Sequence, residues 1–250
     1  MRGGWWIAVA CLLLLAQGCS SPKPLAERTL TVAAAANLTE VFEEMKKAFT
    51  KASGIDVVYS FGATAHLAQQ IDNSAPFDVF AAADTEHVDE LISKRKLTAE
   101  SRAVYARGQL AIWFPKGGMH DVNDLLSPGV RFLSIANPSL APYGKAAVES
   151  LKALGLWDRV QAKIVYGNSI SMAKQHATTG NADAAITAYS LVRNERGAVL
   201  RVDPKLHHPL LQAVGVVAAS KKQHEAAEFC AFLLGPVGRE ILGRYGYGLP

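Results

Sequence analysis

Four short segments of the chain combine small residues with hydroxyl or amide side chains, and a helical pattern follows each of them. They span residues 33–40, 60–67, 137–145 and 166–172. The first N–H groups of a helix have no acceptor within the helix, and the helix dipole favours negative charge at that end. Segments of this kind therefore predict the binding of an anion more directly than they predict catalysis.

The first two segments place a polar side chain directly beside small residues. Asn37 follows four alanines, which let the backbone approach a ligand closely, and Glu40 stands three residues later, as in a capping box. Taken alone, this pattern favours ordinary helix capping without a ligand. In the second segment, Gly62 permits an unusual turn and Thr64 can either cap the next helix or offer an anion a hydroxyl and an amide.

The third and fourth segments repeat this arrangement in the second half of the chain. Pro142 suits the first turn of a helix, and Tyr143 can turn its hydroxyl back over that turn. The alternative for Tyr143 is a half-buried aromatic residue whose phenol meets water. In the fourth segment, Gly167, a polar Asn-Ser pair and Ile170 lead from a strand into a helix, and plain capping is again the alternative.

The elements that must position these segments alternate between strand-like and helix-like patterns from residue 30 onward. We expect strands at 30–36, 55–61, 79–83, 110–114, 131–136, 163–166, 184–188 and 214–219, and helices at 38–52, 65–71, 143–154 and, with an interruption near Gly235-Pro236, 223–245. The alternation predicts an α/β architecture with mostly parallel sheets. In such sheets ligands bind at the carboxyl ends of strands, where helices begin.

Several stretches of the chain together resemble the molybdate-binding proteins of bacterial ABC transporters. They are residues 31–38, 60–64, 67–71, 75–80, 136–138, 141–144 and 245–247, and the resemblance runs from about Leu30 to Leu249. It implies a two-lobed periplasmic binding protein fold of type II, with each lobe a mostly parallel sheet flanked by helices and the lobes joined by crossover strands. The lobes implied are residues 29–109 and 214–250 for lobe I and residues 110–213 for lobe II.

The resemblance also implies which residues line the site between the lobes. Asn37 and Thr64 would line the first lobe, whereas Tyr143 and Ile170 would line the second, Ile170 mainly through its backbone amide. The neighbouring amides of Ala36, Ala63 and Ser169 would contribute. Position 63 is Ala where the family often has Ser, which removes one hydroxyl. Another subgroup uses a late Tyr in lobe II, for which Tyr189 is a candidate of uncertain register.

The four segments contain few cations, so the predicted site holds its anion with neutral donors. Several preorganised N–H and O–H groups, each making a charge-assisted hydrogen bond, can hold a dianion without a countercharge. A site made only of donors rejects a protonated oxyanion such as phosphate. The family implies molybdate or tungstate as the ligand, no cofactor, no metal site other than this one, an ABC transporter permease as partner and a monomeric protein.

The N-terminus has the features of an exported protein. A basic start and an apolar run over residues 5–16 predict a signal peptide at 1–18. Small residues before Cys19 and a polar stretch after it resemble the lipobox of bacterial lipoproteins, which implies a lipid on Cys19 and a tether at 19–28. The alternative is an ordinary cleaved signal and a free periplasmic product. The remaining body contains only Cys230, so we expect no intramolecular disulfide.

Other functions receive less support from the sequence. The net charge of +4 and the lack of a long basic run argue against nucleic-acid binding. The seven His residues show no metal-ligand spacing, and no phosphate-binding glycine motif or nucleophile elbow is present, so an exported enzyme on the same fold is a minor alternative. Sulfate, phosphate, an iron complex or a small organic anion remain as alternative ligands.

Overall fold

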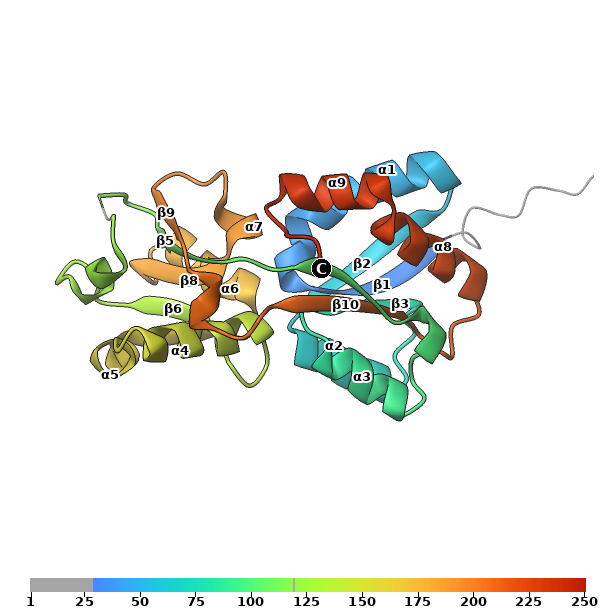
Figure 1. The fold of residues 1–250 in the computed structure, drawn as a ribbon, viewed down its shortest axis with the longest axis horizontal. Coiled ribbons are helices and arrows are strands. Elements are labelled where there is room, and N and C mark those ends of the chain that lie inside the picture. Colours follow the sequence, from blue (N-terminus) through green and yellow to red (C-terminus); the bar gives the residue numbers. More distant parts are fainter. Residues whose placement is uncertain (1–28, 119) are drawn as a thin grey trace, which may run out of the picture.

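The computed structural model describes residues 29–118 and 120–250, which form two lobes, each built on a five-stranded sheet (Figure 1). The sheet of lobe I has the order β2-β1-β3-β10-β4, and that of lobe II has the order β7-β6-β8-β5-β9. The strands are β1 (Thr29–Ala35), β2 (Asp56–Gly62), β3 (Val79–Ala81), β4 (Ala103–Arg107), β5 (Leu110–Phe114), β6 (Leu133–Ala136), β7 (Ile164–Gly167), β8 (Ala184–Ala188), β9 (Ala198–Arg201) and β10 (Leu211–Val216).

The sheets are mixed rather than mostly parallel as predicted. In lobe I, β1 runs parallel to β2 and β3, whereas β10 runs antiparallel to β3 and β4. In lobe II, β6 runs parallel to β7 and β8, whereas β5 runs antiparallel to β8 and β9. The antiparallel pairings arise because β5 and β10 enter each sheet from the other lobe and not through a helical crossover.

The helices cover both faces of each sheet. They are α1 (Thr39–Ser53), α2 (Thr64–Asp72), α3 (Glu86–Ser93), α4 (Pro142–Ala153), α5 (Trp157–Val160), α6 (Ile170–Thr178), α7 (Tyr189–Val192), α8 (Gln223–Leu234) and α9 (Pro236–Arg244). In lobe I, α1, α8 and α9 pack on one face of the sheet and α2 and α3 on the other (Figure 1).

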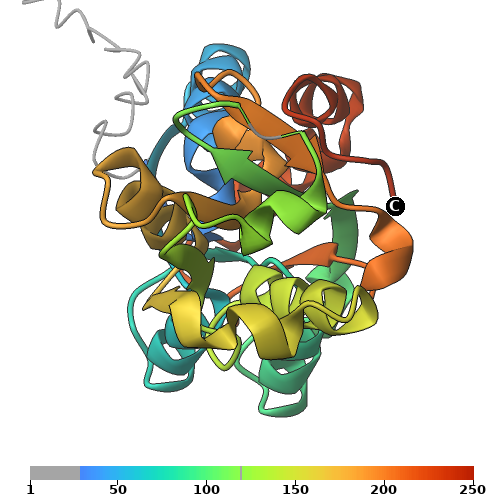
Figure 2. The ribbon, with the colours of Figure 1, turned by 90° about the vertical axis from the view of Figure 1, so that its left-hand side faces the viewer.

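In lobe II, successive residues of β5 belong alternately to two hydrophobic clusters. Leu110 and Ile112 share a cluster with residues of α4, whereas Ala111 and Trp113 share a cluster with Ala177 of α6. This alternation is the period-two pattern of a strand buried on both faces. Figure 2, which views the molecule from the lobe II end, shows α4 and α5 in yellow on the lower side of that lobe.

The chain crosses between the lobes after β4 and again after β9. The predicted boundary at 109/110 falls in the first connection, between Arg107 and Leu110. The predicted boundary at 213/214 falls inside β10, because this strand already pairs with β4 at Leu211. The chain thus returns to the first sheet three residues earlier than predicted.

Most predicted elements are present within a few residues of their expected bounds. The expected strand at 184–188 is β8 to the residue, whereas the one expected at 214–219 is β10 at Leu211–Val216. The patterns missed α3, α5, α7, β4 and β9, which are all short. The predicted signal peptide, the tether and Cys19 lie outside the described residues. No helix in residues 29–118 or 120–250 is long and apolar enough to span a membrane.

Candidate anion-binding site

A small cavity lies between the two lobes, where the starts of three helices meet. Its volume is about 10 Å³, which is the space that one water-sized particle occupies. Lobe I contributes the ends of β1 and β2 with the start of α2, and lobe II contributes the starts of α4 and α6. The lining residues are Ala35, Ala36, Asn37, Gly62, Ala63, Thr64, Ala83, Ala141, Pro142, Tyr143 and Ile170, and none of these carries a charge.

Asn37 lies in a 3-10 helix, Ala36–Leu38, between β1 and α1, and its side chain is buried. The predicted capping box is absent, because Leu38 occupies the N-cap of α1 and cannot cap it with a side chain. The Asn37 amide nitrogen instead donates to Gln212 Oε1 and to the Tyr247 hydroxyl, each at 2.9 Å. The capping interpretation of Asn37 is therefore wrong, and Asn37 and Ala36 both line the cavity.

Ala63 and Thr64 bring the start of α2 to the cavity. Ala63, not Thr64, occupies the N-cap, and its N–H has no acceptor in the part of the chain that the structure describes. The Thr64 hydroxyl oxygen accepts a hydrogen bond from the Ala83 N–H at 3.3 Å, which leaves the hydroxyl hydrogen free to be donated. As the first residue of α2, Thr64 also has an N–H without an acceptor inside the helix.

Lobe II presents Tyr143 in the first turn of α4 and Ile170 as the first residue of α6. Their N–H groups also have no acceptor within their helices. Ser169 is the N-cap of α6, and its hydroxyl accepts from the Met172 N–H at 3.2 Å, so its side chain is used for capping. Ser169 does not line the cavity, whereas the other six predicted residues do.

The Tyr143 ring is fully buried, and its hydroxyl accepts a hydrogen bond from Gln212 Nε2 at 2.9 Å. Burial raises the pKa of Tyr143 well above its usual value, so the phenol is neutral. Neither expected placement of this hydroxyl, over the helix turn or in water, is observed. The predicted alternative Tyr189 stays outside the cavity, where its ring stacks on the Arg201 guanidinium at 4.2 Å.

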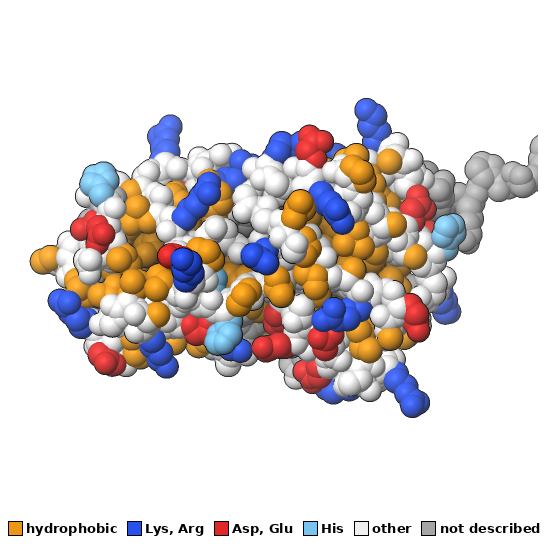
Figure 3. Space-filling model, in the orientation of Figure 1, with side chains coloured by type: hydrophobic (Ala, Val, Ile, Leu, Met, Phe, Trp, Pro, Cys, Tyr) orange, Lys and Arg blue, Asp and Glu red, His pale blue; other side chains and the backbone are white. Residues whose placement is uncertain are grey.

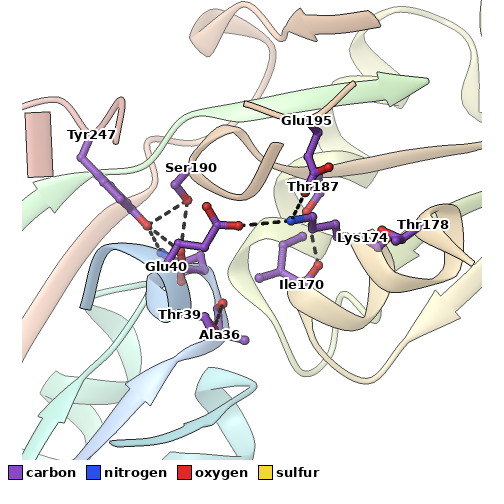
Figure 4. A network of polar contacts seen from close by, with 11 residues as sticks. Ala36, Thr39, Glu40, Ile170, Lys174, Thr178, Thr187, Ser190, Glu195 and Tyr247 are labelled. Atoms are coloured by element: carbon purple, nitrogen blue, oxygen red, sulfur yellow. Dashed lines mark hydrogen bonds and ion pairs between the residues drawn. The ribbon is translucent and has the colours of Figure 1, made fainter. Parts of the chain in front are cut away.

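A partly buried ion-pair cluster joins the lobes beside the cavity (Figure 4). Lys174 of α6 lies 3.1 Å from Glu40 of α1 and 2.7 Å from Glu195. Burial alone would lower the pKa of Lys174, but the carboxylates of Glu195 and Glu40 outweigh it, and the pKa is raised. Glu40 therefore forms an interlobe contact and not a helix cap, while Lys174 faces two carboxylates.

Further contacts show that the lobes are in a closed arrangement. The Ala65 N–H of lobe I donates to the Leu140 carbonyl of lobe II at 3.2 Å. The Ser190 hydroxyl of lobe II donates to the Asn37 carbonyl at 3.0 Å. Because these bonds cross from one sheet to the other, they exist only while the lobes are together.

Acidic and basic side chains are interspersed on the face shown in Figure 3, without a continuous basic area there. Within the described residues, no three His, Cys, Asp or Glu side chains are grouped as a metal ion would require. Cys230 is buried, and this burial raises its pKa to about 12.

The family model of the bacterial extracellular solute-binding proteins matches residues 30–248, nearly the whole described chain. The chain belongs to this family. Members are binding proteins, which agrees with a cavity that has donors but no paired catalytic groups. This solute-binding protein is 38% identical over 224 residues to the molybdate-binding protein ModA of Azotobacter vinelandii, covering 87% of this chain and 89% of that protein.

Two further comparisons extend over most of this solute-binding protein. It is 28% identical over 251 residues to the putative ABC transporter substrate-binding lipoprotein YvgL of Bacillus subtilis, covering 97% of this chain and 96% of that protein. The solved structure of the Azotobacter vinelandii periplasmic molybdate-binding protein superimposes with a TM-score of 0.85 at 30% identity, covering 88% of this chain and 99% of that one. The two-lobed periplasmic binding protein fold is thereby confirmed.

Sequence reasoning missed the residues that surround Asn37 in the solute-binding protein. Gln212 is polar within the otherwise apolar strand β10, which was the available signal. Tyr247 lies in a stretch that carried the family resemblance, although no role had been predicted for it. Tyr105 of β4 gave no signal, because its strand was not predicted.

Proposed function

We propose that this protein captures molybdate or tungstate outside the cytoplasmic membrane and delivers it to an ABC importer. The observation that carries the proposal is the uncharged cavity at three helix starts, lined by Asn37, Thr64, Tyr143 and Ile170. Converging N–H and O–H donors in a desolvated space bind a compact dianion through charge-assisted hydrogen bonds. The names of the Azotobacter relative and of the matching solved structure support the choice of molybdate.

The cavity also limits which ligands fit. At about 10 Å³ while the lobes are closed, the cavity has no room for sugars, amino acids or peptides. In the proposed site Asn37, Thr64, Tyr143 and Ile170 are the principal ligands, and the amides of Ala36 and Ala63 are auxiliary, whereas Ser169 only caps α6. No cofactor takes part.

The proposed setting follows from the N-terminus. An exported chain with a lipid on Cys19 would stay tethered to a membrane through residues 19–28 and work there as a monomer beside its permease. The printed name of the Bacillus relative, an ABC transporter lipoprotein, supports this setting. Mass spectrometry of the membrane fraction, with Cys19→Ser as the comparison, tests the lipid directly.

Titration calorimetry of the body from Ala26 onward tests the ligand. We expect tight one-to-one binding of molybdate and tungstate, and binding of sulfate and phosphate that is weaker by orders of magnitude. Equal affinity for sulfate, or no heat with molybdate, would refute the assignment. If another small anion is the natural ligand, that anion should bind more tightly than molybdate in the same series of titrations.

A further inference from the structure

A buried polar network surrounds Asn37 at the point where the crossing strands meet. Gln212 of β10 is fully buried, and its Oε1 accepts from Asn37 Nδ2 at 2.9 Å and lies 2.9 Å from the Tyr105 hydroxyl, whose one hydrogen is shared with the Ala82 carbonyl. Its Nε2 donates to the Tyr143 hydroxyl at 2.9 Å. The Tyr247 hydroxyl also accepts from Asn37 Nδ2. Gln212 thus links Asn37 of lobe I to Tyr143 of lobe II, and both of these residues line the cavity.

Two groups in this network lack a partner. Asn37 Oδ1 is buried without a hydrogen-bond donor among the described residues. The hydroxyl hydrogen of Tyr143 has no acceptor in the same part of the chain, since the only bond of that hydroxyl is the one it accepts from Gln212. A buried acceptor without a donor is costly, and beside a bound anion it would also repel the ligand.

Turning both carboxamides over by half a turn pairs both of these groups. Asn37 Oδ1 would then accept from Gln212 Nε2, and Gln212 Oε1 would accept from the Tyr143 hydroxyl, while the Tyr247 hydroxyl keeps its bond to the Asn37 carbonyl at 2.8 Å. The Tyr105 hydroxyl, which already donates to the Ala82 carbonyl, would accept from Gln212. The Asn37 NH₂ group would occupy the position of the present unpaired oxygen, where an anion can accept its hydrogens.

We propose that Gln212 is a positioning and specificity residue, which holds the Asn37 carboxamide with its NH₂ group toward the bound anion. This inference rests on the proposed function. In one orientation Asn37 offers the cavity an acceptor, and in the other it offers a donor. A fully deprotonated oxyanion, such as molybdate, selects the donor orientation. A protonated oxyanion, such as hydrogen phosphate, can donate its own hydrogen to the acceptor orientation.

The substitution Gln212→Glu tests the specificity role, because a carboxylate has acceptors only. It would hold Asn37 Nδ2 toward position 212 and leave Asn37 Oδ1 toward the ligand. We would measure molybdate and phosphate binding to the mature protein at about pH 9, so that the buried carboxylate is ionised. Both ligands are dianions there, so simple charge repulsion weakens both equally.

The expected result is a loss of selectivity for molybdate over phosphate of roughly tenfold or more, the factor for one misplaced buried hydrogen bond. Gln109→Glu is the control, since Gln109 lies at the other crossing and bonds to the Val202 carbonyl, away from Asn37. Its selectivity should equal that of the unsubstituted protein. An unchanged molybdate-to-phosphate ratio in Gln212→Glu would overturn the inference.

A second measurement needs no substitution. In nuclear magnetic resonance spectra of the molybdate-bound mature protein, the Gln212 NH₂ protons should show contacts to the Tyr105 ring and not to the Tyr143 ring. Contacts of these protons to the Tyr143 ring in a protein that binds molybdate would overturn the inference alone. Failure of the unsubstituted protein to bind molybdate would instead overturn the proposed function.

Discussion

At the scale of single residues, the site depends on uncharged hydrogen-bond donors that point into one small cavity. Thr64 illustrates the arrangement, because its oxygen is occupied by the Ala83 N–H and its hydrogen is left for a ligand. Tyr143 illustrates a different role, since its N–H lies at a helix start while its hydroxyl belongs to the network of Gln212. One residue can thus serve the ligand with its backbone and the surrounding network with its side chain.

We expect Thr64→Val to weaken molybdate binding by about 1–3 kcal/mol, because a buried donor is lost while the shape of the side chain is kept. Titration calorimetry measures the effect. The control is Thr178→Val, which changes an exposed threonine of α6 whose hydroxyl bonds only to the Lys174 carbonyl. Unchanged affinity in a folded Thr64→Val protein would remove Thr64 from the site.

At the scale of elements, α6 has two roles. Its first residue presents an N–H to the cavity, and one turn later Lys174 reaches Glu40 on the other lobe. The ion pair and the anion thus favour the same closed arrangement, because both are completed when α6 approaches α1. A lysine that lies partly buried between two carboxylates is costly to remove, since the two remaining negative charges repel each other.

We expect Lys174→Met to speed the release of molybdate by roughly tenfold, because removing the lysine leaves Glu40 and Glu195 unpaired at the lobe contact. Stopped-flow displacement by excess tungstate measures the release rate. Lys145→Met is a matched control, since Lys145 also reaches a glutamate of lobe I, Glu86, but at 3.5 Å and with both side chains more than half exposed. Exposed pairs contribute little, so this rate should change by less than about twofold.

The start of α3 carries a pH-sensitive contact of its own. The Asp84 carboxylate, 2.7 Å from the ring of His87, raises the pKa of that histidine from its usual 6.5, against the effect of burial. A raised pKa means that the stabilisation is fully present below pH 6.5 and is lost as the pH rises through the pKa of the folded state.

We therefore expect the stability of the protein to decrease between about pH 6 and pH 8, and this decrease to be smaller in His87→Gln. Urea unfolding at a series of pH values measures it. A His224→Gln protein serves as the control, since His224 lies at the start of α8 and no contact with a carboxylate is present there among the described residues. Identical pH profiles for His87→Gln and the unsubstituted protein would contradict the assignment.

At the scale of the whole molecule, closure depends on contacts between residues that belong to different sheets. The ion pair of Lys174, the bond from Ala65 to Leu140 and the network of Gln212 all cross between the lobes. Within the described residues, the chain joins the lobes covalently at two connections only, residues 108–109 between β4 and β5 and residues 202–210 between β9 and β10. The lobes can therefore separate by changes in those connections while each sheet stays intact.

We expect molybdate to shift the distribution of distances between the lobes to shorter values and to make it narrower. Spin labels on Val58→Cys of β2 and Tyr166→Cys of β7 report it, because both positions are about half exposed and lie on different lobes. Cys230 should stay unlabelled, since burial raises its pKa to about 12. Labels placed on Val58→Cys and Val237→Cys, both in lobe I, give the control, whose distance should not change. Equal distributions between the lobes with and without molybdate would argue against closure.

The sequence by itself determined the local structure and the residues at the helix starts. Periodicity, glycines and the Pro142 helix start act over a few residues, so they predicted the α/β order and brought Asn37, Thr64, Tyr143 and Ile170 forward as candidates. These four do line one cavity. The N-terminal features were equally local, and they support export without any reference to the fold.

Only the tertiary structure decided what those side chains contact. Asn37 looked like a helix cap, but its amide meets Gln212, 175 positions away, and Glu40 meets Lys174, 134 positions away. The crossing of β10 into the first sheet creates the first contact, and the approach of α6 to α1 creates the second. Neither long-range contact leaves a periodic signal in the sequence. Contacts between the lobes are fixed by packing and by the crossing of the chain, and not by the spacing of neighbouring residues.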